Sequence, residues 1–156
     1  MVLRILRAYL FCVIEMELKG ARVDVVGEND YRIIFDHDAL QDIDIALSKL
    51  PEERRAGAAR AFLAASATTC MAGAVNYMLR ARDVKVNGIS ASSSVHMDKN
   101  EKGKVVVDSI TIEVIVDVPE EGTDVLEHCI GLLENGCLVT RSLKRGIKVN
   151  HSIIKK

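Results

Sequence analysis

The clearest pattern in the chain is the alternation of apolar and polar side chains over residues 104–118. One face carries Val106, Ile110, Ile112, Val114, Val116 and Val118, interrupted by Asp108, and the other carries Ser109, Thr111, Glu113 and Asp117. A period of two with one polar face predicts a strand in a sheet that is covered on one side only. The extended segment 84–97 precedes it across the charged turn 98–103, so we expect a hairpin.

Residues 58–82 show a different pattern, in which alanine dominates and apolar side chains recur with a helical period. Alanine is the best helix former, so this stretch predicts one long helix. Small or apolar side chains surround most of its circumference, which is typical of a central, buried helix. We expect it to pack on the apolar face of the 104–118 strand.

The N-terminal third combines short apolar runs with turn signals. Segments 7–18, 22–26 and 31–35 are separated by Lys19-Gly20 and by residues 27–30, and they predict three strands of an antiparallel meander. Apolar residues spaced by three and four then predict a short helix over residues 39–50; they are Leu40, Ile43, Leu47 and Leu50.

The C-terminal third predicts two helices and a strand. Pro119 stops the long strand, Thr123 is a good N-cap for a helix over residues 124–133, and Asn135-Gly136 ends that helix. A short helix then runs from Cys137 to about residue 143, and residues 147–154 predict a final strand. Strands followed by segregated helices indicate an α+β fold, and we expect one domain over residues 1–156.

Composition narrows the classes of function. The 156 residues are 49% apolar, with a formal net charge of −1, which suits one packed domain and provides no strong field for nucleic acid or an anionic membrane. Residues 1–14 faintly resemble a signal peptide, but Glu15 and Glu17 follow at once without a cleavage site, so a strand is favoured. No apolar stretch approaches the roughly 20 residues that span a membrane. We therefore expect a cytosolic protein with free thiols.

The four cysteines carry the candidate chemistry. None makes a Cys-x-x-Cys or a zinc-ligand spacing, and the histidines are not spaced as ligands, so we expect no metal or cofactor. Cys70 lies in the long helix, and Cys137 opens a helix, where the dipole would favour its thiolate. The plainer interpretations are a small core residue for Cys70 and a buried turn residue for Cys137. Cys12 and Cys129 are interpreted as core residues.

Two motifs resemble those of the osmotically inducible protein C and organic hydroperoxide resistance proteins, the OsmC/Ohr family. The first is Leu-Ala-Ala-x-Ala-x-x-Cys at residues 63–70, and the second is Cys-Leu-Val-Thr-Arg-Ser-Leu at residues 137–143, near the family's usual Cys-Pro-x-(Ser/His/Thr)-(Arg/Lys)-x-Leu. The resemblance implies the OsmC-like fold, with antiparallel sheets around a long central helix. It also implies an intertwined homodimer with its active sites at the subunit interface.

The resemblance implies a thiol peroxidase that reduces organic hydroperoxides. Cys70 would be the peroxidatic thiolate, which becomes a sulfenic acid, and Cys137 the resolving thiol. A dithiol such as dihydrolipoamide would then reduce the disulfide. The residue types agree with this chemistry, since a second thiol within reach condenses with a sulfenic acid.

The chain departs from the family at one informative position. Family members that reduce organic hydroperoxides usually have Pro-Glu ten residues before the first cysteine, and here the pair is Ala59-Arg60. That glutamate holds an activating arginine, for which Arg22 is a candidate by position, and a thiolate without it is less stabilised. The alternative is therefore a non-catalytic or ligand-binding protein of the same fold, with unactivated thiols. A third possibility is attack of the same thiolate on another small electrophile.

Overall fold

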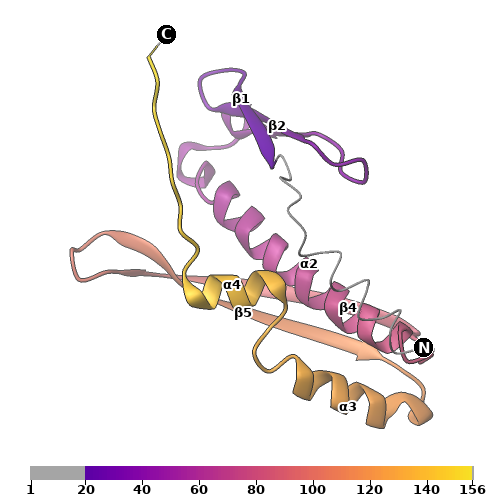
Figure 1. The fold of residues 1–156 in the computed structure, drawn as a ribbon. Helices are drawn as coiled ribbons and strands as arrows, with labels where there is room; N and C mark the ends of the chain where they lie inside the picture. Colours follow the sequence, from indigo (N-terminus) through magenta and orange to yellow (C-terminus); the bar gives the residue numbers. More distant parts are fainter. Residues whose placement is uncertain (1–19, 156) are drawn as a thin grey trace. The chain divides into compact units, whose positions relative to one another are not determined.

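The computed structural model describes residues 20–155 (Figure 1). The predicted strand at 7–18, the signal-like start and Cys12 lie outside these residues. The chain divides into two compact units between Ala56 and Gly57, and each unit has its own sheet.

The first unit is a three-stranded antiparallel sheet in the order β1-β2-β3. Its elements are β1 (Ala21–Val25), β2 (Asp30–Phe35), β3 (Ile43–Ala46) and the short 3-10 helices η1 (Leu47–Lys49) and η2 (Glu52–Arg54). The first two strands confirm the predictions for 22–26 and 31–35. Ion pairs lie along the exposed side chains of the sheet, between Arg22 and Asp24 at 3.1 Å and between Arg32 and Asp44 at 3.2 Å.

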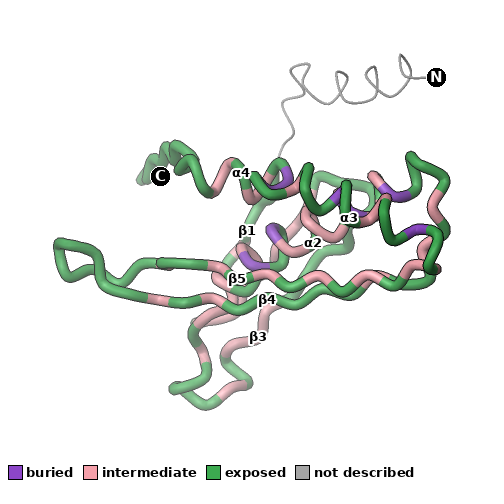
Figure 2. The backbone as a smooth tube through the Cα atoms, turned by 90° about the horizontal axis from the view of Figure 1, so that it is seen from below, coloured by how far each residue is buried: buried purple, intermediate pink, exposed green. Residues whose placement is uncertain are grey.

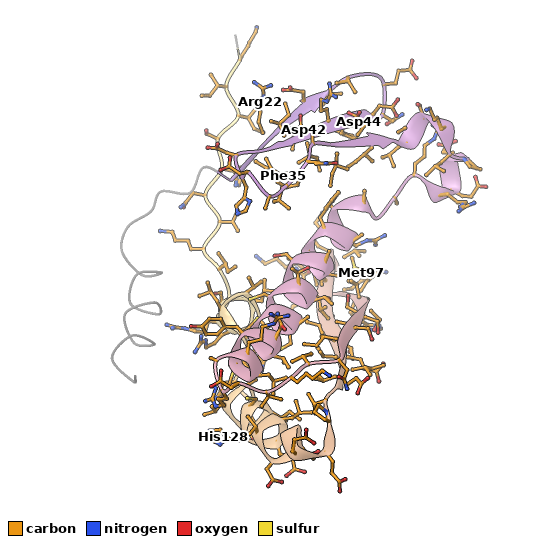
Figure 3. All side chains as sticks on the ribbon, turned by 90° about the vertical axis from the view of Figure 1, so that its right-hand side faces the viewer. Arg22, Phe35, Asp42, Asp44, Met97 and His128 are labelled. Carbon is orange, nitrogen blue, oxygen red and sulfur yellow. The ribbon has the colours of Figure 1, made fainter. Side chains whose placement is uncertain are left out.

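The predicted helix over residues 39–50 is wrong, because this segment supplies β3 and η1. Asp42 and Asp44, labelled in Figure 3, alternate with isoleucines, so a strand period was present beside the helical one. The backbone groups along the second edge of β2 pair with β3, where Ile33 lies opposite Ile43. The chain then turns at Ser48, whose amide and hydroxyl donate to the Asp30 carboxylate at 2.8 and 2.6 Å. These hydrogen bonds, led by that of the Ser48 hydroxyl, lower the pKa of Asp30.

The second unit is a long helix packed on a hairpin, with two shorter helices against it. Its elements are α2 (Ala58–Arg80), β4 (Gly88–Lys99), β5 (Val105–Asp117), the 3-10 helix η3 (Glu120–Gly122), α3 (Thr123–Leu132) and α4 (Leu138–Arg145). Figure 2 shows the β4–β5 hairpin in one layer and the three helices in the other. Helix α2 packs mainly on β4 and also contacts β5, α3 and α4. The predicted α+β class, long helix and hairpin are confirmed.

The alternation along β5 is shifted by a bulge. Ser109 pairs with His96, whereas Met97 pairs with Val107, so Asp108 has no partner across the hairpin. An extra residue in one strand reverses which face the preceding residues occupy. The predicted inward face is therefore confirmed from Ile110 to Val116, but Val107 takes the inward place and Val106 is exposed.

Helix α2 is less covered than its composition predicts. Its buried residues are Ala64, Ala67, Val75 and Leu79, while Ala65, Ser66, Thr69, Gly73 and Tyr77 remain exposed. By length and composition alone, an 18-residue window within Glu52–Arg80, with a mean hydropathy of 1.2, meets the criterion for a membrane span, which the sequence analysis did not expect. Core helices of globular proteins meet the same criterion, and α2 has the hairpin against one side.

The C-terminal elements are partly as predicted. Helices α3 and α4 lie within a few residues of their predicted bounds, but Thr123 is the first residue of α3 and Gly122 the cap. Gly122 packs closely, since a Cβ there would lie 2.8 Å from Cγ1 of Val84. The final strand over 147–154 is wrong: these residues pair with no strand of the described chain, and Ile153 and Ile154 are exposed. A strand requires a neighbouring edge, which a local pattern does not supply.

Candidate functional site

The site lies where the start of α4 meets the middle of α2 (Figure 1). After α3 the chain turns at Gly136, whose φ of +87° favours glycine, and Cys137 follows in an extended conformation as the N-cap of α4. Gly136 is also required for space, because a Cβ there would overlap the Thr140 hydroxyl. The turn therefore fixes both the cysteine and the threonine at the beginning of α4.

The structure brings the two predicted cysteines together. Cys70 is half-buried on α2, and the Val139 amide of α4 donates a hydrogen bond to its Sγ at 3.5 Å. Cys137 is 4% exposed, and both side chains are free thiols. The N-terminal turn of α4 thus contacts both sulfur atoms, although they come from distant parts of the sequence.

Thr140 is a member of the site that the sequence analysis did not find. Its hydroxyl oxygen lies 3.4 Å from Cys137 Sγ and also 3.4 Å from the Cys137 carbonyl oxygen, and its single proton can be donated to one of these two acceptors at a time. The signal was present in the sequence, because a threonine three residues after an N-cap lies beside the cap on the first turn. The hydroxyl gives the Cys137 sulfur a polar neighbour in a largely buried place.

The two thiols have opposite pKa shifts. Burial raises the pKa of Cys70, and hydrogen bonding to Cys137 raises it further, against a smaller lowering by the Val139 amide. Burial also acts to raise the pKa of Cys137, but hydrogen bonding to Cys70, the Thr140 hydroxyl and the first-turn amides outweigh it, so that this pKa is lowered. The amides that contribute to this lowering are those of Val139 and Thr140, in the first turn of α4.

Within residues 57–155, no cationic side chain is among the main causes of either shift. Helix α4 carries Arg141 in its middle, and Lys144 and Arg145 in its last turn, where they complement the negative end of the helix dipole. Arg22, the positional candidate for an activating arginine, pairs with Asp24 in the first unit. In the second unit, the pKa values of the pair are therefore set by burial, by helix α4 and by the two thiols themselves.

Arg60 lies on another side of α2. It lines an open groove of about 670 Å³ between α2 and β4, together with alanines of α2 and with Val95 and Met97 of β4. Met97 is labelled beside α2 in Figure 3. The thiols are not among the lining residues, so the base at the family's glutamate position faces the hairpin side rather than α4.

The other candidates form no site. Cys129 is fully buried against Val75 and Leu79. His128 lies on α3 (Figure 3). No three metal-ligating side chains gather anywhere in residues 20–155. The pair at α2 and α4 brings two thiols from separate elements together.

The family is settled by the sequence profile of OsmC-like proteins, which matches residues 51–152. The chain belongs to the OsmC-like protein family. The match includes both cysteines and the elements from η2 to the end of α4. No curated protein sequence matches the chain.

Solved structures share the OsmC-like fold. The chain is similar to an OsmC-like protein from Mycoplasma pneumoniae, with a TM-score of 0.60, 19% identity, and 85% of this chain and 91% of that chain covered. An OsmC-like protein from Vibrio cholerae gives a TM-score of 0.59 at 13% identity, covering 81% and 94%. An organic hydroperoxide resistance protein from Elizabethkingia anophelis, with thiocyanate bound, gives 0.52 at 18% identity, covering 86% and 93%.

Proposed function

We propose that the protein is a thiol peroxidase that reduces organic hydroperoxides with Cys70 and Cys137 as a redox couple. The observation that carries the proposal is the meeting of both thiols at the first turn of α4, where the Val139 amide donates to Cys70. Membership of the OsmC-like family and the likeness in fold to an organic hydroperoxide resistance protein support the same chemistry.

The reaction balances with the groups in the site and a dithiol. A thiolate attacks one peroxide oxygen, the O–O bond breaks, an alcohol leaves, and the sulfur becomes a sulfenic acid. The second thiol then attacks that sulfur, releasing water and leaving a Cys70–Cys137 disulfide. A dithiol reductant, of which dihydrolipoamide is the implied example, returns both thiols and becomes a disulfide itself. The family resemblance assigns the first attack to Cys70, but the overall function holds for either order.

Peroxide consumption tests this function. Purified protein is mixed with cumene hydroperoxide and excess dihydrolipoamide, and peroxide loss is followed beside Cys70→Ser, Cys137→Ser and the matched control Cys129→Ala. We expect turnover by the wild type and by the control, and loss of turnover in both serine variants. Equal background rates for all four proteins would rule the proposal out.

A second candidate function is ligand binding by an OsmC-like protein with unactivated thiols. The raised pKa of Cys70 and the groove beside Arg60 favour it. It requires that iodoacetamide reacts slowly with both Cys70 and Cys137 at pH 6. Fast alkylation of either cysteine at that pH would contradict it, because only an activated thiol is ionised there to a useful extent.

We also propose a homodimer built from one OsmC-like domain over residues 1–156. The exposed small-residue side of α2 and the exposed apolar residues after α4 support a partner copy, and the family match crosses the division between the two units. Equilibrium sedimentation tests the stoichiometry: a mass near twice the 17.1 kDa of the chain is expected. A single 17.1 kDa species at micromolar concentration would contradict the dimer.

A further inference from the structure

The charges of the chain are unevenly distributed along it. The whole sequence has a formal net charge of −1, whereas residues 135–156 contain no aspartate or glutamate. The basic residues of this stretch, which we call the basic segment, are Arg141, Lys144, Arg145, Lys148, Lys155 and Lys156. An excess of one sign over a short stretch indicates an interaction with a surface of the opposite charge.

The helical part of the basic segment, α4, has two unlike sides. Val139 and Leu143 are half-buried on the side that packs on α2. Leu138, Arg141 and Arg145 are spaced by three and four residues, so they share the other side, and all three are exposed. The outer side of α4 therefore presents a large apolar side chain and two cations to solvent.

The rest of the basic segment is apolar and exposed. The chain runs on from α4 without regular secondary structure, as an extended trace (Figure 1). Its exposed large apolar residues are Ile147, Val149, Ile153 and Ile154, and the last two are 96% and 84% exposed. They alternate with or adjoin Lys148 and Lys155. Apolar side chains gathered in this way on a surface mark a site of interaction.

The cations of the basic segment keep their charge unneutralised. The ion pairs of the described chain join residues of the first unit, so no carboxylate pairs with a cation of residues 138–155. Lys144 Nζ donates a hydrogen bond at 3.5 Å to the backbone carbonyl oxygen of Glu134, which carries no net charge. The basic segment therefore combines an excess of positive charge with exposed apolar surface.

We propose that the basic segment docks on an anionic lipid bilayer. The cations of α4 and its neighbours contact the headgroups, and the exposed isoleucines enter the boundary between headgroups and acyl chains. Nucleic acid matches the cations but leaves the isoleucines in water. A second copy of the chain covers the isoleucines but brings a net charge of −1 rather than a continuous anionic surface. The bilayer matches both properties, and the inference does not depend on the proposed peroxidase function.

Binding to lipid vesicles tests the proposal. The reduced full chain is mixed with vesicles of phosphatidylcholine alone or of equal parts phosphatidylcholine and phosphatidylglycerol, and the bound fraction is measured by co-sedimentation. We expect at least about tenfold tighter binding to the anionic vesicles. Raised salt should weaken that binding, because it screens exposed charges. Equal binding to the two kinds of vesicle, or binding to neither, would overturn the proposal.

Charge removal shows whether the basic segment is the part that binds. The double variant Arg145→Gln/Lys148→Gln should bind the anionic vesicles at least about tenfold more weakly. Its matched control is Lys102→Gln/Lys104→Gln, which removes the same charge from exposed positions at the turn of the β4–β5 hairpin. An equal loss of binding in the two double variants would show that net charge matters and that the basic segment does not, which contradicts the proposal.

The isoleucines separate a bilayer from other anionic partners. Ile153→Ser/Ile154→Ser should lower vesicle binding several-fold, whereas Val105→Ser, an exposed apolar residue on β5, should leave it unchanged. Vesicle binding that is indifferent to the isoleucine changes would overturn the insertion of this segment. Binding of duplex DNA at the same salt, with no binding to vesicles, would identify a nucleic-acid surface instead.

The outcomes are also distinguishable from those for the other proposals. A dimer by sedimentation that binds neither kind of vesicle would place the basic segment between copies and overturn the docking on lipid. Binding to anionic vesicles by a protein that consumes no peroxide would leave this inference in place and remove the proposed peroxidase function.

Discussion

Helix α2 contacts two shorter helices, and each contact contains cysteine in a different setting. Where α2 meets α3, Cys129 is sealed among apolar side chains with Val75 and Leu79. Where α2 meets α4, Cys70 and Cys137 meet a hydroxyl and the free amides of a helix start. Both contacts bury thiols, so burial does not distinguish an inert cysteine from a reactive one. The polar groups around the sulfur do.

The largest expected difference between the two contacts is in activity. Cys70→Ser and Cys137→Ser should each lower peroxide turnover by at least about 100-fold, because loss of a group that acts as part of a unit removes most of the rate. Cys129→Ala should keep turnover and lose stability instead, by roughly 1–3 kcal/mol, since it leaves a cavity in a packed core. Turnover assays measure the activity and thermal unfolding measures the stability. A Cys137→Ser protein with full activity would contradict the expected difference between the two contacts.

Gly136→Ala tests how the α4 turn is held. The substitution places a Cβ against the Thr140 hydroxyl at a φ of +87°, so we expect a loss of about 1–3 kcal/mol in the free energy of unfolding. Since the strain lies at the start of α4, peroxide turnover should fall as well. Gly146→Ala is the matched control: it also has a positive φ of +72°, but no atom lies within 4 Å of the added Cβ. Equal turnover in the two variants would show that the turn geometry is unimportant.

The pH dependence of alkylation tests the opposite pKa shifts of the pair. A lowered pKa keeps the thiolate of Cys137 populated as the pH falls below 9, whereas a raised pKa removes that of Cys70 first. Iodoacetamide at pH 7 to 8 should therefore modify Cys137 faster than Cys70. Peptide mass spectrometry of quenched samples gives both rates. Faster modification of Cys70 over this range would contradict the opposite pKa shifts of the two thiols.

The smallest expected effect belongs to the Thr140 hydroxyl. Thr140→Val keeps the shape and removes the polar group beside Cys137 Sγ, so the pKa of Cys137 should rise. One hydrogen bond is worth about 0.5–1.5 kcal/mol, which corresponds to about a 2- to 10-fold slower alkylation at pH 7. Thr140→Ser, which restores a hydroxyl, should recover most of the rate. An unchanged pH profile in Thr140→Val would remove the threonine from the site.

The sequence predicted those parts of the fold whose pattern is local and unambiguous. The alanine-rich helix, the hairpin and the helices α3 and α4 follow from periodicity and from turn residues. The pattern of residues 39–50 fits both a helix and a strand. The strand forms because its backbone pairs with the open edge of β2. Asp108 interrupts the apolar face in the sequence, but this interruption alone does not identify a bulge. The predicted strand over 147–154 has no edge to pair with in the described chain.

The sequence predicted the two cysteines of the candidate site but not how the site is arranged in space. The proximity of Cys70 and Cys137 came from family resemblance, because a spacing of this length does not determine a contact. The sequence identifies Gly136 only as a turn residue and Thr140 only as a helix residue. Their close approach at the start of α4 is visible only in the structure. The placement of Arg60 on the groove side depends on the packing of α2 against β4.

Mapping of disulfides after oxidation tests the central claim most directly. The fully reduced protein is treated with one equivalent of cumene hydroperoxide, alkylated, and digested without reductant for peptide mass spectrometry. The account predicts a Cys70–Cys137 disulfide in most molecules, formed as one equivalent of peroxide disappears, with Cys129 still a free thiol. Peroxide that persists while Cys70 and Cys137 both remain reduced would contradict it.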